Sequence, residues 1–129
     1  MSGSPDFARA PHARGRGAVG EDEAVRWLEA QGFAVVERNV RNHAGEIDLV
    51  AQEGETLAFV EIKARATDSY GPAIAAVPPS KQRRIARAAS LYLAMSRWDG
   101  PCRFDVLGLD GEPGGGWRYT LIRNAFAAA

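Results

Sequence analysis

The segment from residue 46 to residue 64 constrains the fold most, because two alternating runs flank a short turn. The runs are Glu46 to Gln52 and Thr56 to Ala64, and Glu53-Gly54-Glu55 connects them. A short connection that contains glycine between two such runs is typical of a β-hairpin. We therefore expect two antiparallel strands here.

The second run of this hairpin carries charged side chains on a face that begins as apolar. Period-two alternation assigns Leu57, Phe59, Glu61 and Lys63 to one face and Ala58, Val60 and Ile62 to the other. Charges in such a place are costly unless they pair with each other, bind a metal or reach a solvent-filled cleft. The first run also places charged and apolar side chains on the same face. It assigns Glu46, Asp48 and Val50 to one face, and Ile47, Leu49 and Ala51 to the other.

The length of the turn decides whether two of these carboxylates meet. If Gly54-Glu55 is a two-residue loop, Glu53 faces Thr56, and counting back from that pair sets Asp48 opposite Glu61. Opposite residues have Cβ atoms about 4.5 to 5.5 Å apart, so the carboxylates would repel each other. A hard cation such as Mg²⁺ relieves that repulsion. A three-residue loop would instead place Asp48 opposite Val60 and turn Glu61 to the other face, unless a bulge restored the register.

The remaining patterns predict an α/β (α+β) fold with a central mixed sheet flanked by helices. A helix begins at Gly20 and ends at Gly32, and a second helix follows Ser80, a plausible N-cap, with an apolar stripe that includes Met95. The expected order is α-β-β-β-α-β-β, in one domain over residues 20–124 between a disordered basic tail, 1–19, and a short C-terminal tail, 125–129. The expected helices and outer strands cover residues 20–32, 33–40, 81–97, 103–109 and 117–122.

Composition excludes several classes of protein. Cys102 is the single cysteine, which rules out an internal disulfide and a zinc cluster of several thiolates, and we expect it to be a small buried residue. No apolar run approaches the roughly 18 residues that span a bilayer, and the start has no secretory signal. We expect a cytoplasmic protein without a membrane partner.

Positive charge is concentrated in the second helix, although the formal net charge is zero. No acidic residue occurs from Ser69 to Trp98. The spacing of Lys81, Arg84 and Arg87 suits contacts with phosphates, and a helix N-terminus is itself an anion site. The alternative is a solvated face that complements the acidic first helix. Of the sixteen basic residues only Lys63 and Lys81 are lysines, which hints at sites that need a compact ammonium group.

Glu21 is a further candidate for the carboxylate site. It precedes Ala24, Val25 and Leu28 by three, four and seven residues, so it lies on the core-facing side of the first helix. The alternative is that it only provides favourable negative charge at a helix N-terminus.

These residues resemble a known family. The order of Glu21, Gly45-Glu46-Ile47-Asp48-Leu49-Val50 and Phe59-Val60-Glu61-Ile62-Lys63-Ala64-Arg65 is similar to that in the YraN-like family of uncharacterised bacterial proteins. That family is in turn similar to the PD-(D/E)xK nuclease superfamily, which includes archaeal Holliday-junction resolvases. One departure is Ile47, which stands before Asp48 where the superfamily motif has proline.

The resemblance implies a restriction-endonuclease-like α-β-β-β-α-β core and a role for each matching residue. Asp48 and Glu61 would ligate Mg²⁺, for which Mn²⁺ substitutes, with help from the Ile62 backbone carbonyl and Glu21. Lys63 would orient or activate the attacking water. Lys81-Gln82 matches the pair that opens the second helix in the family. With these two residues, Arg84 and Arg87 from the spacing above, and Arg65 after the E-x-K run, are the expected contacts for nucleic acid.

Two functions are therefore expected. The first is a metal-dependent endonuclease that hydrolyses phosphodiester bonds in DNA, including branched or junction DNA in repair and recombination. A homodimer would follow in that case, because a four-way junction presents two symmetric scissile sites. The second is a non-catalytic module that binds nucleic acid or a protein partner. A third interpretation of Asp48, Glu61 and Lys63 is an exposed cross-strand salt-bridge cluster.

Overall fold

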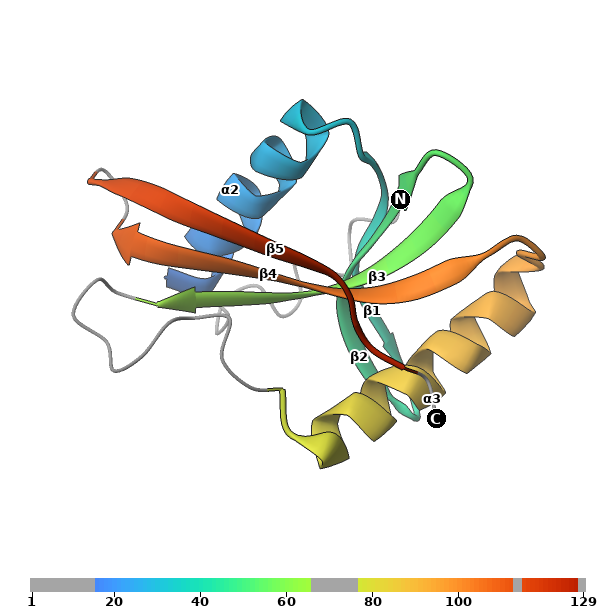
Figure 1. The fold of residues 1–129 in the computed structure, drawn as a ribbon. Helices are drawn as coiled ribbons and strands as arrows, with labels where there is room; N and C mark the ends of the chain where they lie inside the picture. The colour runs from blue at the N-terminus through green and yellow to red at the C-terminus, as the bar shows by residue number, and fades with distance from the viewer. Residues whose placement is uncertain (1–15, 66–76, 113–114, 128–129) are drawn as a thin grey trace.

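Two helices enclose a five-stranded mixed sheet in the computed structural model, which describes residues 16–65, 77–112 and 115–127 (Figure 1). The predicted order of helices and strands is confirmed. The elements are α2 (Arg16–Ala30), β1 (Ala34–Asn42), β2 (Gly45–Glu53), β3 (Thr56–Arg65), α3 (Pro79–Ser96), β4 (Cys102–Glu112) and β5 (Gly116–Phe126).

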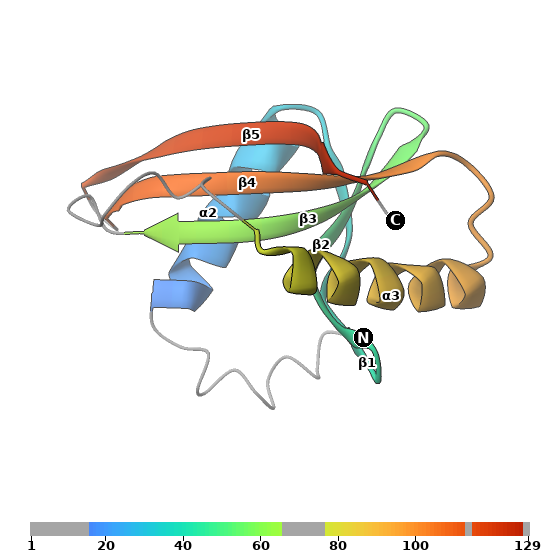
Figure 2. The ribbon, with the colours of Figure 1, turned by 60° about the horizontal axis from the view of Figure 1, so that its bottom comes forward.

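The strands lie in the sheet in their sequence order, and all neighbours are antiparallel except β3 and β4. A parallel pair needs a crossover connection, and α3 lies in the connection between β3 and β4. Figure 2 shows α3 on the opposite side of the sheet from α2. Each face of the sheet is therefore covered by one helix.

Each helix packs on its own apolar core. The α2-side core contains Leu28 together with Leu49, Ala51, Ala58, Val60, Leu107 and Leu109 from the sheet. The α3-side core contains Ile85, Ala88 and Ala89 together with Val50, Leu57, Phe59 and Phe104. The predicted alternation in β3 is confirmed, since Leu57 and Phe59 face α3 while Ala58 and Val60 face α2.

The register of the β2–β3 hairpin is also confirmed. Glu53 pairs with Thr56, and the ladder continues to Leu49 opposite Val60. Gly54 has a φ of 61°, the left-handed conformation that a tight two-residue hairpin turn requires. The turn therefore sets the register that brings Asp48 and Glu61 to the same level.

The predicted alternation in β2 is wrong at Ile47. Leu49 packs in the α2-side core, whereas Ile47, two residues earlier, packs in the α3-side core. The break coincides with Asn39 in β1, which has a φ of 53° and lies between the pairs Arg38–Leu49 and Val40–Ile47. A left-handed residue kinks the chain, and asparagine tolerates that conformation better than most residues. In Figures 1 and 2, β1 and β2 turn away while β3 continues beside β4.

Both ends of the domain extend further than predicted. The expected basic tail, 1–19, lies partly outside the described residues, but residues 16–19 belong to α2. An existing helix adds turns at little further cost, and no proline intervenes after Pro11. At the other end, β5 continues to Phe126, whose ring stacks on Phe104 with centroids 5.0 Å apart.

Three local expectations about α3 and its surroundings are wrong. The helix is preceded by Pro78 as N-cap and begins at Pro79, not after Ser80, because proline fits the first helical position. Met95 is 81% exposed, since Arg97 ends the helix with a φ of 61° and the last turn extends beyond the core. Cys102 is exposed at the start of β4. Within the described ranges, neither helix is long and apolar enough to cross a membrane.

Candidate metal-binding site

Asp48 lies where β2 and β3 separate. The backbone ladder between the strands runs to Leu49 and Val60, and just beyond it Asp48 Oδ2 accepts a hydrogen bond of 2.8 Å from Ile62 N. The side chain of Asp48 thus replaces a backbone acceptor of β2 along the edge of β3. This contact directs the carboxylate toward β3 instead of toward solvent.

Glu61 is the second carboxylate of the site. It is buried on β3, on the face that carries Leu57 and Phe59 toward α3. Its Oε2 forms an ion pair with Lys81 Nζ from the first turn of α3. The Glu61 side chain is 6% exposed and that of Lys81 is 37% exposed, so solvent reaches the pair from the lysine side.

The two carboxyl groups interact strongly. Burial and, after it, the negative charge of Glu61 raise the pKa of Asp48 to about 8, and a side-chain hydrogen bond to Glu61 adds to the shift. The Ile62 N–H and the Lys81 charge act in the opposite direction. The carboxyl group of Asp48 is therefore hard to ionise beside Glu61 unless further positive charge enters the site.

Lys63 follows Glu61 by two residues in β3 and falls on the same face by alternation. It is partly buried and pairs in the sheet with Gly108 of β4. In the part of the chain that the structure describes, Lys63 forms no salt bridge. Its ammonium group is therefore not neutralised by either carboxylate of the pair.

Glu21 lies next to the site without joining the carboxylate pair. Its Oε1 accepts hydrogen bonds from Arg38 Nη2 at 3.3 Å and from Asn39 Nδ2 at 3.2 Å. Asn39 lies between the pairs Arg38–Leu49 and Val40–Ile47, which sets it level with Asp48, so Glu21 contacts the part of β1 that lies beside Asp48. Among the described residues, no three His, Cys, Asp or Glu side chains are grouped to hold a metal ion.

The donor set nonetheless suits a hard divalent cation. Asp48 and Glu61 supply carboxylate oxygens, the ligands that Mg²⁺ prefers, and Mg²⁺ commonly takes only one or two protein carboxylates beside water and phosphate. Burial and, after it, the charge of Glu61 make negative charge on Asp48 unfavourable, as the raised pKa of Asp48 indicates. A divalent cation would compensate it, with Asp48 and Glu61 as its ligands.

The family model described as "Uncharacterised protein family UPF0102" matches residues 20–109. The chain belongs to this family. A UPF0102 protein of Symbiobacterium thermophilum is 50% identical over 113 residues, which cover 87% of this chain and 96% of the relative. A UPF0102 protein of Herminiimonas arsenicoxydans is 46% identical over 108 residues, covering 82% and 87%. The resemblance to the YraN-like family of uncharacterised bacterial proteins is confirmed.

One solved structure is weakly similar to this UPF0102 chain. It is Pyrococcus furiosus SfsA in complex with Ca²⁺, with a TM-score of 0.34 and 16% sequence identity. The match covers 75% of this chain and 57% of the other. A likeness of that size supports no statement about the activity of the UPF0102 chain.

The predicted phosphate-binding residues of the UPF0102 chain point in different directions. Lys81 turns inward to Glu61, and Gln82 Nε2 donates to Val77 O at 2.8 Å. Arg84 and Arg87 are exposed, as is Arg83, and none of the three is in an ion pair within the described segments. The side chain of Arg65 lies outside the described residues.

Two of these exposed arginines, Arg83 and Arg87, border hollows on the surface of α3. One has a volume of about 390 Å³ and is lined by Ala127, near the end of the chain, and by residues of α3: Pro79, Gln82, Arg83, Ala86, Arg87 and Ser90. The other, of about 440 Å³, is lined by His43, Ala44, Arg87, Ser90 and Leu91. Arg87 and Ser90 line both hollows, so this arginine lies on the ridge between them. In the remainder of the article, the arginine face means Arg83, Arg84 and Arg87.

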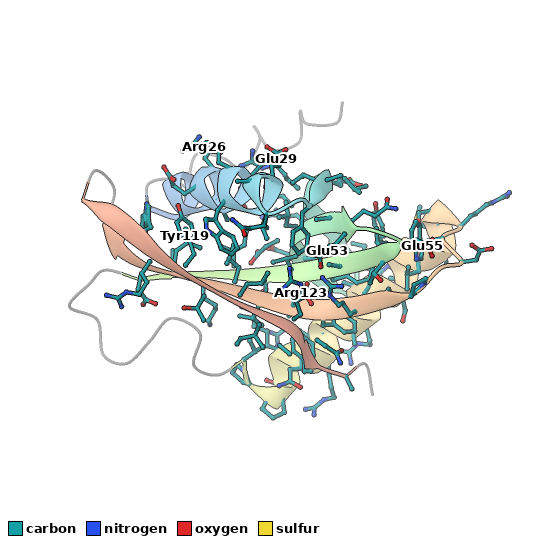
Figure 3. All side chains as sticks on the ribbon, turned by 45° about the horizontal axis from the view of Figure 1, so that its top comes forward. Arg26, Glu29, Glu53, Glu55, Tyr119 and Arg123 are labelled. Atoms are coloured by element: carbon teal, nitrogen blue, oxygen red, sulfur yellow. The ribbon has the colours of Figure 1, made fainter. Side chains whose placement is uncertain are left out.

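A second acidic cluster of the UPF0102 chain was not predicted. Glu53 accepts hydrogen bonds from Arg103 at 2.5 Å and from Arg123 at 2.7 and 2.8 Å, and Figure 3 shows Glu53 beside Arg123. The Arg123 hydrogen bond and the Arg103 contact lower the pKa of Glu53 to about 2, against the effect of burial. The three residues come from β2, β4 and β5, so only the assembled sheet brings them together.

Asp105 extends this cluster into the sheet. Arg103 Nε donates to Asp105 Oδ1 and Oδ2 at 2.9 and 3.0 Å, and Asn124 N also donates to Asp105 at 2.9 Å. Asp105 is fully buried in β4, between β3 and β5. The carboxylates of Glu53 and Asp105 thus accept hydrogen bonds from arginines and from a backbone N–H. Buried polar groups with such partners are typical of a network that stabilises the fold.

Proposed function

We propose that this UPF0102 protein is a Mg²⁺-dependent nuclease-type hydrolase that acts on phosphodiester bonds in DNA. One observation carries the proposal: the fold holds the carboxyl groups of Asp48 and Glu61 together, and among the described residues Lys81 alone forms an ion pair with them. Structural ion-pair networks normally balance their charges, as the Glu53 cluster does. Groups with strongly shifted pKa values that are not balanced are typical of functional sites.

Asp48 and Glu61 are the proposed metal ligands, and the Ile62 backbone carbonyl is a proposed third. When bound, Mg²⁺ would lower the pKa of a bound water and neutralise charge on the scissile phosphate. The hydrogen bond from Ile62 N keeps Asp48 in place at the end of the β2–β3 ladder. Asp48 is thus oriented by a backbone contact of β3, and Glu61 belongs to β3 itself, so both ligands are held by strands of the sheet.

Lys63 is the proposed residue for orienting the attacking water or stabilising charge on the phosphate. Its ammonium group shares a face of β3 with Glu61 and forms no salt bridge among the described residues. Positive charge placed where negative charge develops in the transition state lowers the barrier. We propose a supporting role for Glu21, which holds Asn39 and Arg38 opposite the part of β2 that carries Asp48.

The arginine face is the proposed contact surface for the DNA backbone, with Arg65 and Gln82 as further candidates. Arg84 and Arg87 are exposed on α3, the helix whose first turn reaches Glu61 through Lys81. Arginine forks bind phosphate oxygens, and such contacts position DNA without selecting a sequence. The preference for branched or junction DNA, and a homodimer to cut two symmetric strands, rest on the resemblance to resolvases.

A cleavage assay tests the activity. Wild-type protein is incubated with labelled linear, flapped and four-way-junction DNA in Mg²⁺ or Mn²⁺. We expect cleavage that falls at least about 100-fold in Glu61→Gln and in Lys63→Met, because each removes charge that acts in the transition state. Glu55→Gln is the matched control, since Glu55 is exposed in the turn of the same hairpin. Equal cleavage by all four proteins, or by none, would contradict the proposal.

A non-catalytic binding module is the second candidate, and the Lys81–Glu61 ion pair favours it, because that pair partly satisfies Glu61 without a metal. This alternative predicts DNA binding that weakens with salt and with Arg84→Ala plus Arg87→Ala, but survives Asp48→Ala and Glu61→Ala. Fluorescence anisotropy at several salt concentrations separates it from the enzyme, provided that the cleavage assay is negative.

A further inference from the structure

Both lysines of the chain belong to the neighbourhood of Glu61. Lys63 lies two residues further along the same face of β3, and Lys81 reaches Glu61 from α3. The other fourteen basic residues are arginines. An ammonium group pairs with a single oxygen on a flexible stem, whereas a guanidinium group prefers a rigid two-point contact. A lysine at position 81 therefore suits an ion pair with Glu61 that can form and dissociate.

The local position of Lys81 in α3 opposes its charge. Lys81 lies in the first turn, at the positive end of the helix dipole, and that turn contains no acidic residue. Its backbone N–H is bonded to Pro78 O, so the start of the helix is fixed while the side chain can still move. Glu61 is thus the group that holds the ammonium in place in the absence of other ligands.

The exposure of the two partners is unequal. Glu61 is almost fully covered, but more than a third of the Lys81 side chain reaches solvent, on the helix that carries the arginine face. A cation that enters the site from solvent therefore meets Lys81 before it meets Glu61. The ammonium group and a divalent cation would repel each other at the same carboxylate.

We propose that Lys81 is a tethered counter-ion, which neutralises Glu61 in the metal-free protein and leaves it for the solvent side of α3 when a divalent cation binds. This inference rests on the proposed metal site. After release, the ammonium stands beside the arginine face, where it can contact a phosphate of bound nucleic acid. Lys81 is thus a positioning residue that links metal binding to the DNA surface.

The lysine content makes a direct experiment possible. Protein labelled with ¹³C and ¹⁵N only in lysine gives two side-chain signals, which Lys63→Arg assigns. In the metal-free protein we expect the Lys81 Nζ hydrogens to exchange slowly, and Glu61→Gln to abolish that protection. Titration with Mg²⁺ should move the Lys81 signal to that of a free ammonium, with the same midpoint as binding measured by calorimetry.

Substitutions on α3 measure how much Lys81 lowers the affinity for a divalent cation. Lys81→Met should bind Mn²⁺ about tenfold more tightly than wild type in the absence of DNA, because a competing positive charge is removed. Lys81→Arg should keep the weaker affinity of wild type. Arg83→Met is the matched control, because it removes one exposed positive charge two residues away and should leave the affinity unchanged.

The outcomes separate the two proposals. Metal binding that leaves the Lys81 signal unmoved, or a Lys81→Met affinity no higher than wild type, overturns the counter-ion role and leaves the proposed metal site intact. If neither wild type nor Lys81→Met binds Mg²⁺ or Mn²⁺, the metal site and the counter-ion role both fail.

Discussion

The β2–β3 hairpin carries an acidic site near each end, and the two sites differ in charge balance. Near the turn, Glu53 meets two arginines, and its pKa is lowered to about 2. Where the strands separate, Asp48 meets Glu61 and only one lysine, and its pKa is raised to about 8. The same type of side chain is therefore stabilised in its charged form at one end and in its neutral form at the other.

The difference teaches which site serves the fold. Arginines from β4 and β5 converge on Glu53, so its ion pairs join three strands of the sheet. No comparable gain in sheet stability comes from Asp48, because its burial and the charge of Glu61 oppose its ionisation in the folded protein and are absent from the unfolded chain. Sites that reduce stability in this way are commonly retained for activity.

Glu53→Gln should give the largest change. It leaves two arginines with a weaker acceptor, so we expect a loss of about 2 to 3 kcal/mol in the free energy of unfolding at pH 7. The folded pKa of Glu53 lies below its unfolded value of 4.5, so the stabilisation is present above pH 4.5 and is lost as the pH falls toward 2.

Urea titrations from pH 7 down to pH 2 test this effect. The curves of wild type and Glu53→Gln should converge as the acid limit is approached. A difference that stays constant with pH would show that the amide alters packing instead of ionic contacts.

Asp48→Asn should change stability in the opposite direction. The folded pKa of Asp48 lies above its unfolded value of 3.8, so its contribution is fully present below pH 3.8 and is lost as the pH rises through about 8. The amide remains neutral, and we expect a gain of about 1 to 2 kcal/mol at pH 8 in metal-free buffer. Thermal unfolding from pH 4 to pH 8 measures it, and a variant that is less stable than wild type at pH 8 would refute the account of charge repulsion.

Mn²⁺ should raise the free energy of unfolding through the Asp48 end of the hairpin and not through the Glu53 end. At a concentration about ten times its dissociation constant, a ligand that binds only the folded state adds about 1.4 kcal/mol. We expect this gain in wild type and in Glu53→Gln but not in Asp48→Asn, with release of about one proton per metal at pH 7 because Asp48 must ionise. Calorimetry in two buffers of different ionisation enthalpy counts the protons. A gain that persists in Asp48→Asn would locate the metal elsewhere.

Glu55→Gln should give the smallest effect, within about 0.5 kcal/mol at any pH. Glu55 is exposed in the turn, two residues after Glu53, and Figure 3 shows it beyond the arginine contacts. The variant therefore reports the loss of one negative charge from the hairpin without loss of either site. A larger change in its urea midpoint would mean that net charge, not local pairing, controls the first two results.

Local patterns determined much of what was predicted correctly. Gly54-Glu55 defined the hairpin register, and alternation in β3 placed Glu61 on the same face as Leu57 and Phe59. These predictions succeed because a two-residue turn and a period of two leave few alternatives.

The errors involve contacts between distant segments. The reversal of Ile47 depends on the backbone of Asn39 in the neighbouring strand, and Lys81 meets Glu61 only after α3 has packed on the sheet. The Glu53 cluster needs β4 to pair in parallel with β3, which places Arg103 within reach. Propensity and periodicity carry no information about such tertiary contacts.

The left-handed backbone of Asn39 restricts which residues can occupy position 39, and this restriction does not appear in the motif of Asp48, Glu61 and Lys63. The kink sends Ile47 to the α3 side and leaves Asp48 beside β3, so the position of the acid depends on which residues tolerate a φ of 53° on the adjacent strand. A mutational scan should accept glycine or aspartate at position 39 and reject valine or isoleucine, although this side chain is outside the carboxylate pair. Among distant homologues, a match to Asp48, Glu61 and Lys63 would therefore identify the proposed site residues without guaranteeing their geometry.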